Sequence, residues 1–305
     1  MAACCLAEVE RGSALVCQVR NPFPNPLPFR EEGYYGSPMS LHETAYAKLN
    51  LALHVRARRA DGYHELETLF AFVDAGDVLT ARPAALDELH TLGEFAGALT
   101  DPFDNIVMQA LTALPRAEGL AITLEKNLPV AAGLGGGSAD AGAVFRLVER
   151  SHGWPDDWAT RAARLGADVP ACVRSETCLG RGTGTDLERG PTDLAGTPVL
   201  LVNPRLPLAT GPVFRAWDGL DRGPLPAGTA RQIALAGRND LEMPAISLCP
   251  QIAEVLAGLR STGAWLTRMS GSGATCFGLY ADEAQRDAAA ATMPREWWQM
   301  AGKLR

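Results

Sequence analysis

Four glycines within five positions, Gly133, Gly135, Gly136 and Gly137, restrict the fold of this chain more than any other feature. Glycine has no Cβ, so the backbone can adopt positive φ there and direct several N–H groups toward one point. Ser138 follows, and small residues continue with helical spacing over 139–148. Because the start of a helix is electropositive, the run predicts a loop and helix N-terminus that bind phosphate.

The order of residues in this run excludes the two commonest nucleotide-binding loops. A P-loop needs lysine followed by serine or threonine after its last glycine, and here Ser138 and Ala139 stand in those places. A dinucleotide loop needs the pattern G-x-G-x-x-G, which no register of the run supplies. The sequence therefore predicts a phosphate-binding loop of another class.

Composition narrows the function classes. The chain has 305 residues, 47% of them hydrophobic and 21% charged, which is typical of a globular protein with two domains or lobes. Its net charge of −7 and the lack of a basic stripe argue against a nucleic-acid partner. No apolar run approaches the roughly 18 residues of a membrane helix, so no membrane partner is expected.

The cysteines and histidines give no metal or disulfide pattern. Seven cysteines, an odd number, include no C-x-x-C pair, and the five histidines show no metal-binding spacing. We therefore expect a reduced, cytoplasmic protein, and both metal ligands and oligomeric state stay undetermined.

Residues 1–40 differ from the remainder. Four prolines within residues 21–28 exclude a helix or a central strand, and acidic residues near the start argue against a signal peptide. We interpret 1–40 as a disordered or artefactual extension. Our hypothesis is that translation starts at Met39, which mass spectrometry of the native N-terminus would test.

The remaining chain mixes strands and helices without strict alternation, which favours an α+β fold. Residues 41–190 are predicted to form an N-terminal lobe that carries the phosphate-binding loop, and residues 191–305 a C-terminal lobe. Apolar patterns predict strands at 47–55, 66–73, 77–81, 121–125, 198–203, 264–269 and 275–280, and helices at 105–114, 139–148, 156–165 and 251–261.

Five motifs in order along the chain resemble the GHMP kinase superfamily. They are Ala47-Lys48-Leu49-Asn50-Leu51, residues 59–66 (Arg-Ala-Asp-Gly-Tyr-His-Glu-Leu), residues 133–138, residues 165–170 (Leu-Gly-Ala-Asp-Val-Pro) and Ser270-Gly271-Ser272-Gly273. The resemblance implies two α+β lobes, an active site in the cleft between them, and ATP with Mg²⁺. The second motif points to members that phosphorylate a 2-hydroxyl of a cytidine diphosphate ester in isoprenoid biosynthesis.

Two alternatives stay open. One is another GHMP kinase, acting on homoserine, mevalonate or a sugar, against which the Asp61-Gly62-Tyr63-His64 segment argues. The other is a regulator that binds nucleotide without catalysis, against which the presence of both Lys48 and Asp168 argues.

The resemblance also assigns candidate site residues. Asp168 would be the catalytic base and Lys48 its partner, because a neighbouring lysine keeps a carboxylate charged and orients the substrate hydroxyl. Taken singly, they would be a helix-capping aspartate and a solvent-facing strand lysine. The ATP phosphates would be held by Pro129, Val130, Ala131, Ala132, Gly133, Leu134, Gly135, Gly136, Gly137, Ser138 and Ala139.

For the substrate, Tyr63 would stack on the cytosine and His64 would hydrogen-bond its edge, while Asn50 would bind polar groups. Thr210 and Phe214 stand where the family places a threonine and a second aromatic residue, although Phe214 could equally be a core residue. Ser138 is expected to cap the helix, with contact to Mg²⁺ as the alternative.

Two further segments complete the expectations. Ser270–Gly273 is expected to shape the floor of the cleft. In Gly182-Thr183-Gly184-Thr185 the last residue departs from the glutamate usual in the family, so no role is assigned to that loop.

Overall fold

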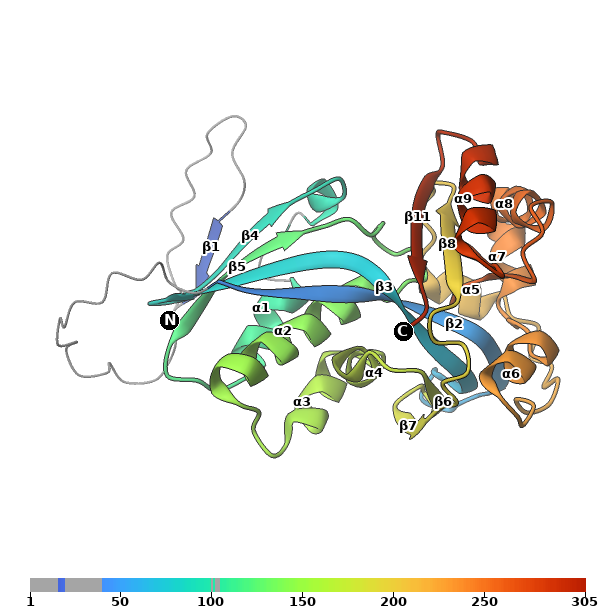
Figure 1. The fold of residues 1–305 in the computed structure, drawn as a ribbon. Coiled ribbons are helices and arrows are strands. Elements are labelled where there is room, and N and C mark those ends of the chain that lie inside the picture. Colours follow the sequence, from blue (N-terminus) through green and yellow to red (C-terminus); the bar gives the residue numbers. More distant parts are fainter. Residues whose placement is uncertain (1–15, 20–39, 100, 102–104) are drawn as a thin grey trace.

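Two β-sheets form the framework of the molecule (Figure 1). The computed structural model describes residues 16–19, 40–99, 101 and 105–305. Most of the expected N-terminal extension, Met39 included, lies outside the described residues. Within it, β1 (Val16–Val19) pairs antiparallel with β4 (Asp87–Leu92).

The first sheet has seven strands in the order β1-β4-β5-β3-β6-β7, and β2 pairs with β3. Its other members are β2 (Leu41–Arg58), β3 (His64–Ala84), β5 (Gly119–Glu125), β6 (Cys178–Gly182) and β7 (Asp186–Arg189). Only β4 and β5 pair in parallel among the described strands. The two strands expected at 66–73 and 77–81 are one long strand, β3, because its pairing with β2 continues through residues 76 and 77.

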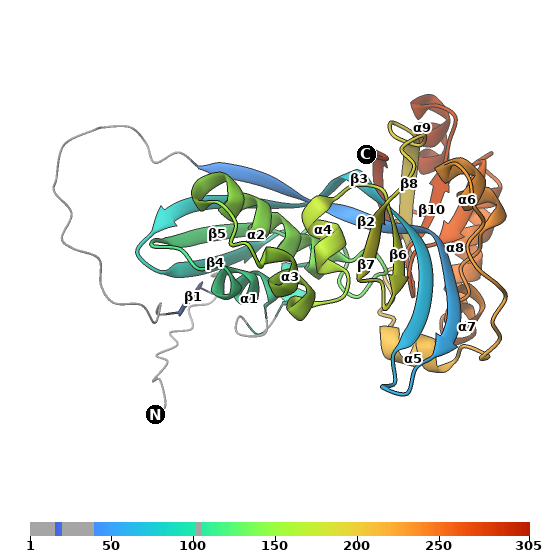
Figure 2. The same ribbon diagram turned by 90° about the horizontal axis from the view of Figure 1, so that it is seen from below.

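Four helices cover one face of the first sheet (Figures 1 and 2). They are α1 (Ile106–Ala113), α2 (Gly136–His152), α3 (Trp158–Leu165) and α4 (Val169–Arg174). Helix α2 lies against β2, α1 and α4, and its buried residues include Phe145. The small residues of α2 explain this close packing: a Cβ on Gly142 would lie 2.6 Å from the backbone of Cys172.

The second sheet has the order β11-β8-β10-β9, and all its pairs are antiparallel. Its strands are β8 (Pro198–Asn203), β9 (Leu266–Met269), β10 (Cys276–Leu279) and β11 (Trp298–Lys303). Around it lie η1 (Ala96–Ala98), α5 (Thr210–Arg215), α6 (Ala230–Ala236), α7 (Glu242–Leu248), α8 (Gln251–Arg260) and α9 (Glu283–Thr292).

Both faces of β8 are buried, which explains its uninterrupted apolar sequence. Val199 and Leu201 pack in a core that includes Leu49 of β2, whereas Leu200 and Val202 pack with Ile252 of α8. The second sheet therefore lies between its own helices and the strands of the first lobe. The predicted two-lobed α+β fold is confirmed, while the lobe boundary near residue 190 stays a prediction because β2 packs in both lobes.

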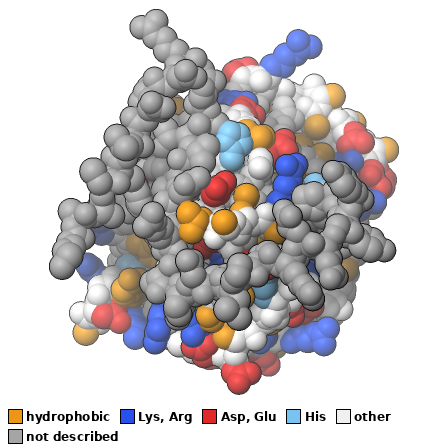
Figure 3. All heavy atoms as spheres, turned by 90° about the vertical axis from the view of Figure 1, so that its left-hand side faces the viewer, with side chains coloured by type: hydrophobic (Ala, Val, Ile, Leu, Met, Phe, Trp, Pro, Cys, Tyr) orange, Lys and Arg blue, Asp and Glu red, His pale blue; other side chains and the backbone are white. Residues whose placement is uncertain are grey.

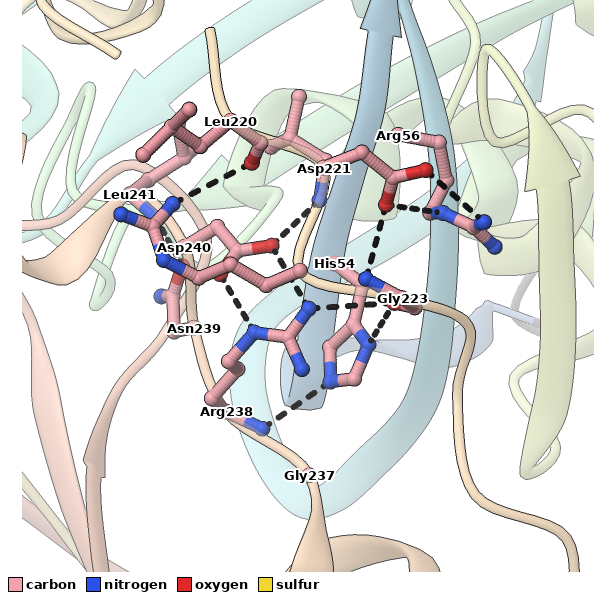
Figure 4. Close-up of polar contacts among 12 residues, drawn as sticks. His54, Arg56, Leu220, Asp221, Gly223, Gly237, Arg238, Asn239, Asp240 and Leu241 are labelled. Atoms are coloured by element: carbon pink, nitrogen blue, oxygen red, sulfur yellow. Dashed lines mark hydrogen bonds and ion pairs between the residues drawn. The ribbon is translucent and has the colours of Figure 1, made fainter. Parts of the chain in front are cut away.

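A polar latch joins the second lobe to the end of β2 (Figure 4). The backbone N–H of Arg238 donates to Nε2 of His54 at 3.2 Å, and Nδ1 of His54 donates to the carbonyl oxygen of Gly223 at 3.0 Å. A carboxylate oxygen of Asp240 accepts from the backbone N–H of Val55 at 2.8 Å. Burial is the main cause that lowers the pKa of His54, which keeps the ring neutral and able to accept.

Figure 3 shows the opposite end of the molecule. Acidic, basic and hydrophobic side chains are interspersed over the described part of that face. No helix among the described residues is long and apolar enough to cross a membrane.

Candidate active site

A cleft of about 830 Å³ opens between the two lobes. The first lobe contributes the glycine-rich loop, Lys48, Asp168 and Tyr63–His64, and the second lobe contributes Thr210, Phe214 and Gly271–Ser272. Segments more than 200 positions apart in the sequence therefore meet at one site. The five motifs of the sequence analysis come together here, as the inter-lobe cleft prediction requires.

The glycine-rich loop connects β5 to α2 and is fixed from three sides. The N–H of Lys48 donates to the carbonyl oxygen of Leu134 at 2.9 Å, and the N–H of Thr275 donates to that of Ala132 at 3.1 Å. The hydroxyl of Ser270 donates to the carbonyl oxygen of Gly133 at 2.8 Å. The loop is thus preorganised by β2 and by the motif that precedes β10.

Two glycines of the loop are required by space and by conformation. Gly133 has φ +77°, and a Cβ there would lie 2.2 Å from the carbonyl oxygen of Ser270. Gly135 has φ +61°, and its Cβ would lie 3.0 Å from Cε of Lys48. Any other residue at these positions would displace the loop from the second lobe or from the lysine.

Helix α2 begins directly after the loop, and its first turn lines the cleft. The expectation that Ser138 caps this helix is wrong: the N-cap is Gly135, and Ser138 is the third helical residue. The reason is that the left-handed glycine turns the chain into the helix three residues earlier than the serine. Leu134 and Ala139 are buried in the core and do not line the cleft.

Lys48 and Asp168 form an ion pair with 2.9 Å between Nζ and Oδ2. Asp168 precedes α4 but makes no capping hydrogen bond, so it is not a helix-capping aspartate. Lys48 is buried, so it is not a solvent-facing lysine. The ammonium group also lies 4.4 Å from the ring centre of Phe70 and 3.3 Å from Oδ1 of Asn50. The lysine is therefore held in one position.

Asn50 forms hydrogen bonds through both its side chain and its backbone. Its Nδ2 donates to Thr68 Oγ1 at 2.8 Å, and its backbone N–H donates to Ser270 Oγ at 3.2 Å. Its Oδ1 accepts from Lys48. Asn50 lines the cleft, yet these contacts use its amide mainly to position the lysine.

Aromatic side chains gather at the other end of the cleft. The ring of His64 lies 4.9 Å from that of Phe214 and 5.7 Å, edge to face, from that of Trp217. Burial lowers the pKa of His64, and the positive charge of Arg58 lowers it further, so the ring is neutral near pH 7. Tyr63 is 65% exposed, which leaves a ring face free at the mouth.

Thr210 and the β6–β7 turn complete the wall. The hydroxyl of Thr210 lies 3.0 Å from that of Ser272, and both residues line the cleft. Thr183 and Gly184 of the turn also line it. Phe214 packs on the core of the second lobe and also lines the cleft, so its core packing does not exclude the substrate contact expected of it.

A buried charge cluster of Lys126, Asp77 and Asp140 lies next to the glycine-rich loop. Nζ of Lys126 contacts Oδ2 of Asp77 and, at 2.7 Å, Oδ2 of Asp140. Oδ1 of Asp77 accepts from the N–H groups of Asn127 and Leu128 at 2.6 and 2.7 Å. Burial is the largest cause that raises the pKa of Asp140 to about 8. The charge of Asp77, which shares the ammonium group of Lys126 with Asp140, raises it further.

Sequence reasoning missed this cluster and three cleft or near-cleft residues. Leu99 and Ile106 form an apolar wall beside the glycine loop, and Trp217 supports His64. Lys126 follows β5 with ordinary sequence neighbours, so no local signal marks it. Asn105, which accepts from the N–H of Val107 as the N-cap of α1, was the one recognisable signal near the apolar wall.

The arrangement can bind phosphate at one end and an aromatic base at the other, with an acid–base pair between them. Groups of three or more metal-ligating side chains do not occur among the described residues. The fold and this cleft define a small-molecule kinase of the GHMP type.

Comparisons with known proteins agree. The family description "GHMP kinases N terminal domain" matches residues 105–176, and "GHMP kinases C terminal" matches residues 227–299. A Novosphingobium aromaticivorans protein named 4-diphosphocytidyl-2-C-methyl-D-erythritol kinase is 72% identical over 282 residues, covering 92% of this chain and 97% of its own. An Erythrobacter litoralis protein of the same name is 64% identical, covering 86% and 98%.

Solved structures give the same result. A 4-(cytidine 5'-diphospho)-2C-methyl-D-erythritol kinase is similar with a TM-score of 0.75 and 35% identity, covering 87% of this chain and 99% of that one. Homoserine kinase from Cytophaga hutchinsonii shares the fold, with a TM-score of 0.63 at 16% identity. The chain belongs to the GHMP kinase family, in the group of proteins named 4-diphosphocytidyl-2-C-methyl-D-erythritol kinase.

Proposed function

We infer that this chain transfers the γ-phosphoryl group of ATP to the 2-hydroxyl of 4-diphosphocytidyl-2-C-methyl-D-erythritol. The observation that carries the inference is the Lys48–Asp168 pair, which lies between a phosphate-binding loop and an aromatic base site in one cleft. The names of relatives at 72% and 64% identity support the same substrate.

In this mechanism Asp168 is the general base. Its carboxylate accepts the proton of the 2-hydroxyl as that oxygen bonds to the γ-phosphorus. The bond between the γ-phosphorus and the bridging oxygen breaks, and ADP leaves with its electron pair. The ammonium group of Lys48 keeps the carboxylate and the hydroxyl in line. Phosphoryl transfer asks a protein mainly for such positioning and for charge stabilisation.

The glycine-rich loop and the start of α2 hold the phosphates of ATP through backbone N–H groups. Leu99 and Ile106 offer an apolar surface for the purine beside the loop. Mg²⁺ would enter with ATP and neutralise the charge on the transferring phosphates. Ser138 fits this ion, since it lines the cleft in the first turn of α2 and carries a hydroxyl oxygen that could serve as a ligand. Phosphate oxygens and water supply the other ligands that Mg²⁺ prefers.

The cytosine would stack on Tyr63 and Phe214, with the neutral ring of His64 at its edge. A neutral imidazole carries one donor and one acceptor nitrogen, and so complements a base edge that carries both kinds of group. Asn50 and Thr210 would contact the polar remainder of the substrate. The cytoplasm is the proposed compartment, and the four described cysteines, which are free and buried, support it.

A coupled assay of ADP release tests the function. ADP should form when ATP and the cytidyl substrate are both present, and no faster than background with homoserine, mevalonate or galactose. Equal or greater activity on one of those three would establish the alternative GHMP kinase. If the chain binds ATP but turns over neither the cytidyl substrate nor any of these three compounds, it is a regulator that binds nucleotide without catalysis.

A further inference from the structure

Two arginines on the wall of the cleft have no acidic partner among the described residues. Arg58 is the last residue of β2, and Arg215 is the last residue of α5. The other two cations that line the cleft, Lys48 and Lys126, are each paired with aspartate. Arg58 and Arg215 are therefore the cleft's uncompensated positive charges in the described part of the chain.

Both arginines lie beside the residues of the proposed base site. Arg58 pairs in register with His64, and its charge reaches that ring. Arg215 follows Phe214, whose ring packs on His64. An Nη atom of Arg215 lies 3.2 Å from the position that a Cβ on Gly211 would occupy, so the side chain folds over the start of α5.

Arg58 and Arg215 are exposed at the cleft, so their guanidinium groups are solvated by water and free to bind an anion. The whole chain carries a net charge of −7, so local positive charge is required to bring in an anionic substrate. The planar guanidinium group matches phosphate oxygens in a bidentate geometry that lysine lacks. The diphosphate of a nucleoside is joined to the base through a single ribose, and Arg58 and Arg215 lie on the cleft wall next to His64 and Phe214 of the proposed base site.

We propose that Arg58 and Arg215 bind the diphosphate of the cytidyl substrate and so select it over uncharged cytidine compounds. This inference rests on the proposed function, in which that diphosphate joins the nucleoside to the sugar alcohol. In this arrangement the diphosphate of the cytidyl substrate binds at the two arginines, whereas the phosphates of ATP bind at the glycine loop.

Calorimetric titration tests the proposal in full-length protein whose ATP site is saturated with a non-hydrolysable ATP analogue. Cytidine and CDP are the probes, and their affinity ratio isolates the diphosphate. The wild-type chain should prefer CDP. Arg58→Gln and Arg215→Gln should each reduce that preference about tenfold, since each removes charge-assisted hydrogen bonds at a partly exposed site. Cytidine affinity should not change.

Matched controls come from the neighbouring sequence. Arg59 is paired with Asp61 and Glu65, and Arg222 is paired with Asp218; neither lines the cleft. Arg59→Gln and Arg222→Gln should keep the CDP preference. Arg215→Lys should recover part of it, because it restores the charge without the bidentate geometry.

Steady-state kinetics give an independent measurement. The KM for the cytidyl substrate should rise about tenfold in each variant, while kcat and the KM for ATP stay within about twofold. An unchanged ratio of CDP to cytidine affinity in the double variant would overturn the proposal, as would a loss of ATP affinity equal to the loss of CDP affinity.

The proposed function can fail separately. If the wild-type chain does not phosphorylate the cytidyl substrate, the function is wrong, whatever the CDP titration gives. If it does, and the double variant still prefers CDP, only the assignment of the two arginines is wrong.

Discussion

Nζ of Lys48 lies 2.9 Å from Oδ2 of Asp168, and the two side chains differ sharply in exposure, 5% against 35%. The lysine is enclosed by Phe70 and Asn50, whereas the carboxylate opens onto the cleft. Both side chains line the cleft, but the carboxylate is the more open of the two and is better placed to accept a proton from a substrate hydroxyl, while the ammonium group holds it in place. This asymmetry supports the division of roles between base and partner.

Asp168→Asn should lower kcat by about 10²–10⁴-fold, because the amide cannot accept the hydroxyl proton. The affinity for ATP should be retained, since the glycine loop is not changed. Kinetics and ATP titration measure the two effects. Asp157→Asn, at an exposed residue paired with Arg161, is the control. Near-normal turnover of Asp168→Asn would refute the base assignment.

Lys48→Met should also reduce kcat, by about 10²-fold, because the carboxylate loses its positioning partner. The double variant with Asp168→Asn should be little slower than Asp168→Asn itself, since residues that act as one unit are not additive. Lys303→Met, at an exposed lysine paired with Glu283, is the matched control. Full additivity in the double variant would mean that the two residues act independently.

His64→Ala should weaken binding of the cytidyl substrate about 5–100-fold, by loss of a base contact and of support for Phe214. ATP affinity should be unaffected, because His64 and the glycine loop lie at different ends of the cleft. Separate titrations with each ligand test this, with His42→Ala at an exposed site as control. A parallel fall in both affinities would show that His64 is not part of a base site.

Lys126→Met should destabilise the fold by about 3–5 kcal/mol, because it leaves the carboxylate of Asp77 buried without its counter-charge. Asp140→Asn should cost much less, since the amide oxygen can still accept from Lys126 and the carboxyl that it replaces, with a pKa of about 8, is already mostly protonated at neutral pH. Urea unfolding of the two variants compares these free energies. Equal losses would show that the cluster's charge balance does not matter to stability.

Acidification should weaken the latch at His54. Its pKa is lowered in the folded protein, so the unfolded chain binds the proton first, and stability falls as the pH drops below about 6.5. Protonation of Nε2 also removes the acceptor of the Arg238 N–H. The loss of unfolding free energy between pH 7.5 and 5.5 should be smaller in His54→Asn than in the wild type.

The control for this experiment is His42→Asn, which changes an exposed histidine outside the latch. It should leave the pH dependence as in the wild type. His54→Asn keeps a donor for the Gly223 carbonyl, so a general loss of structure is avoided. An unchanged pH dependence in His54→Asn would contradict the role of this residue.

Much of the fold could be predicted because its signals are local. The apolar run of β8 and the spacing of α2 fix their elements through nearest neighbours along the chain. The division of β3 at residues 74–76 was wrong because its backbone pairing with β2 continues there: Gly76 pairs with Tyr46 and Asp77 with Ala45. An interruption of the apolar pattern marks the end of a strand only when the neighbouring strand does not continue the pairing.

The sequence by itself determined the glycine-rich loop, since positive φ at Gly133 and Gly135 is a property of those residues. By resemblance it also indicated Lys48 and Asp168. Only the tertiary structure decided that Ser138 is not the cap, that Lys126 supports the loop, and that Arg58 and Arg215 have no acidic partner in the described part of the chain. Conformational preference belongs to a residue and its neighbours, whereas the partner of a charge is chosen when distant strands and helices meet.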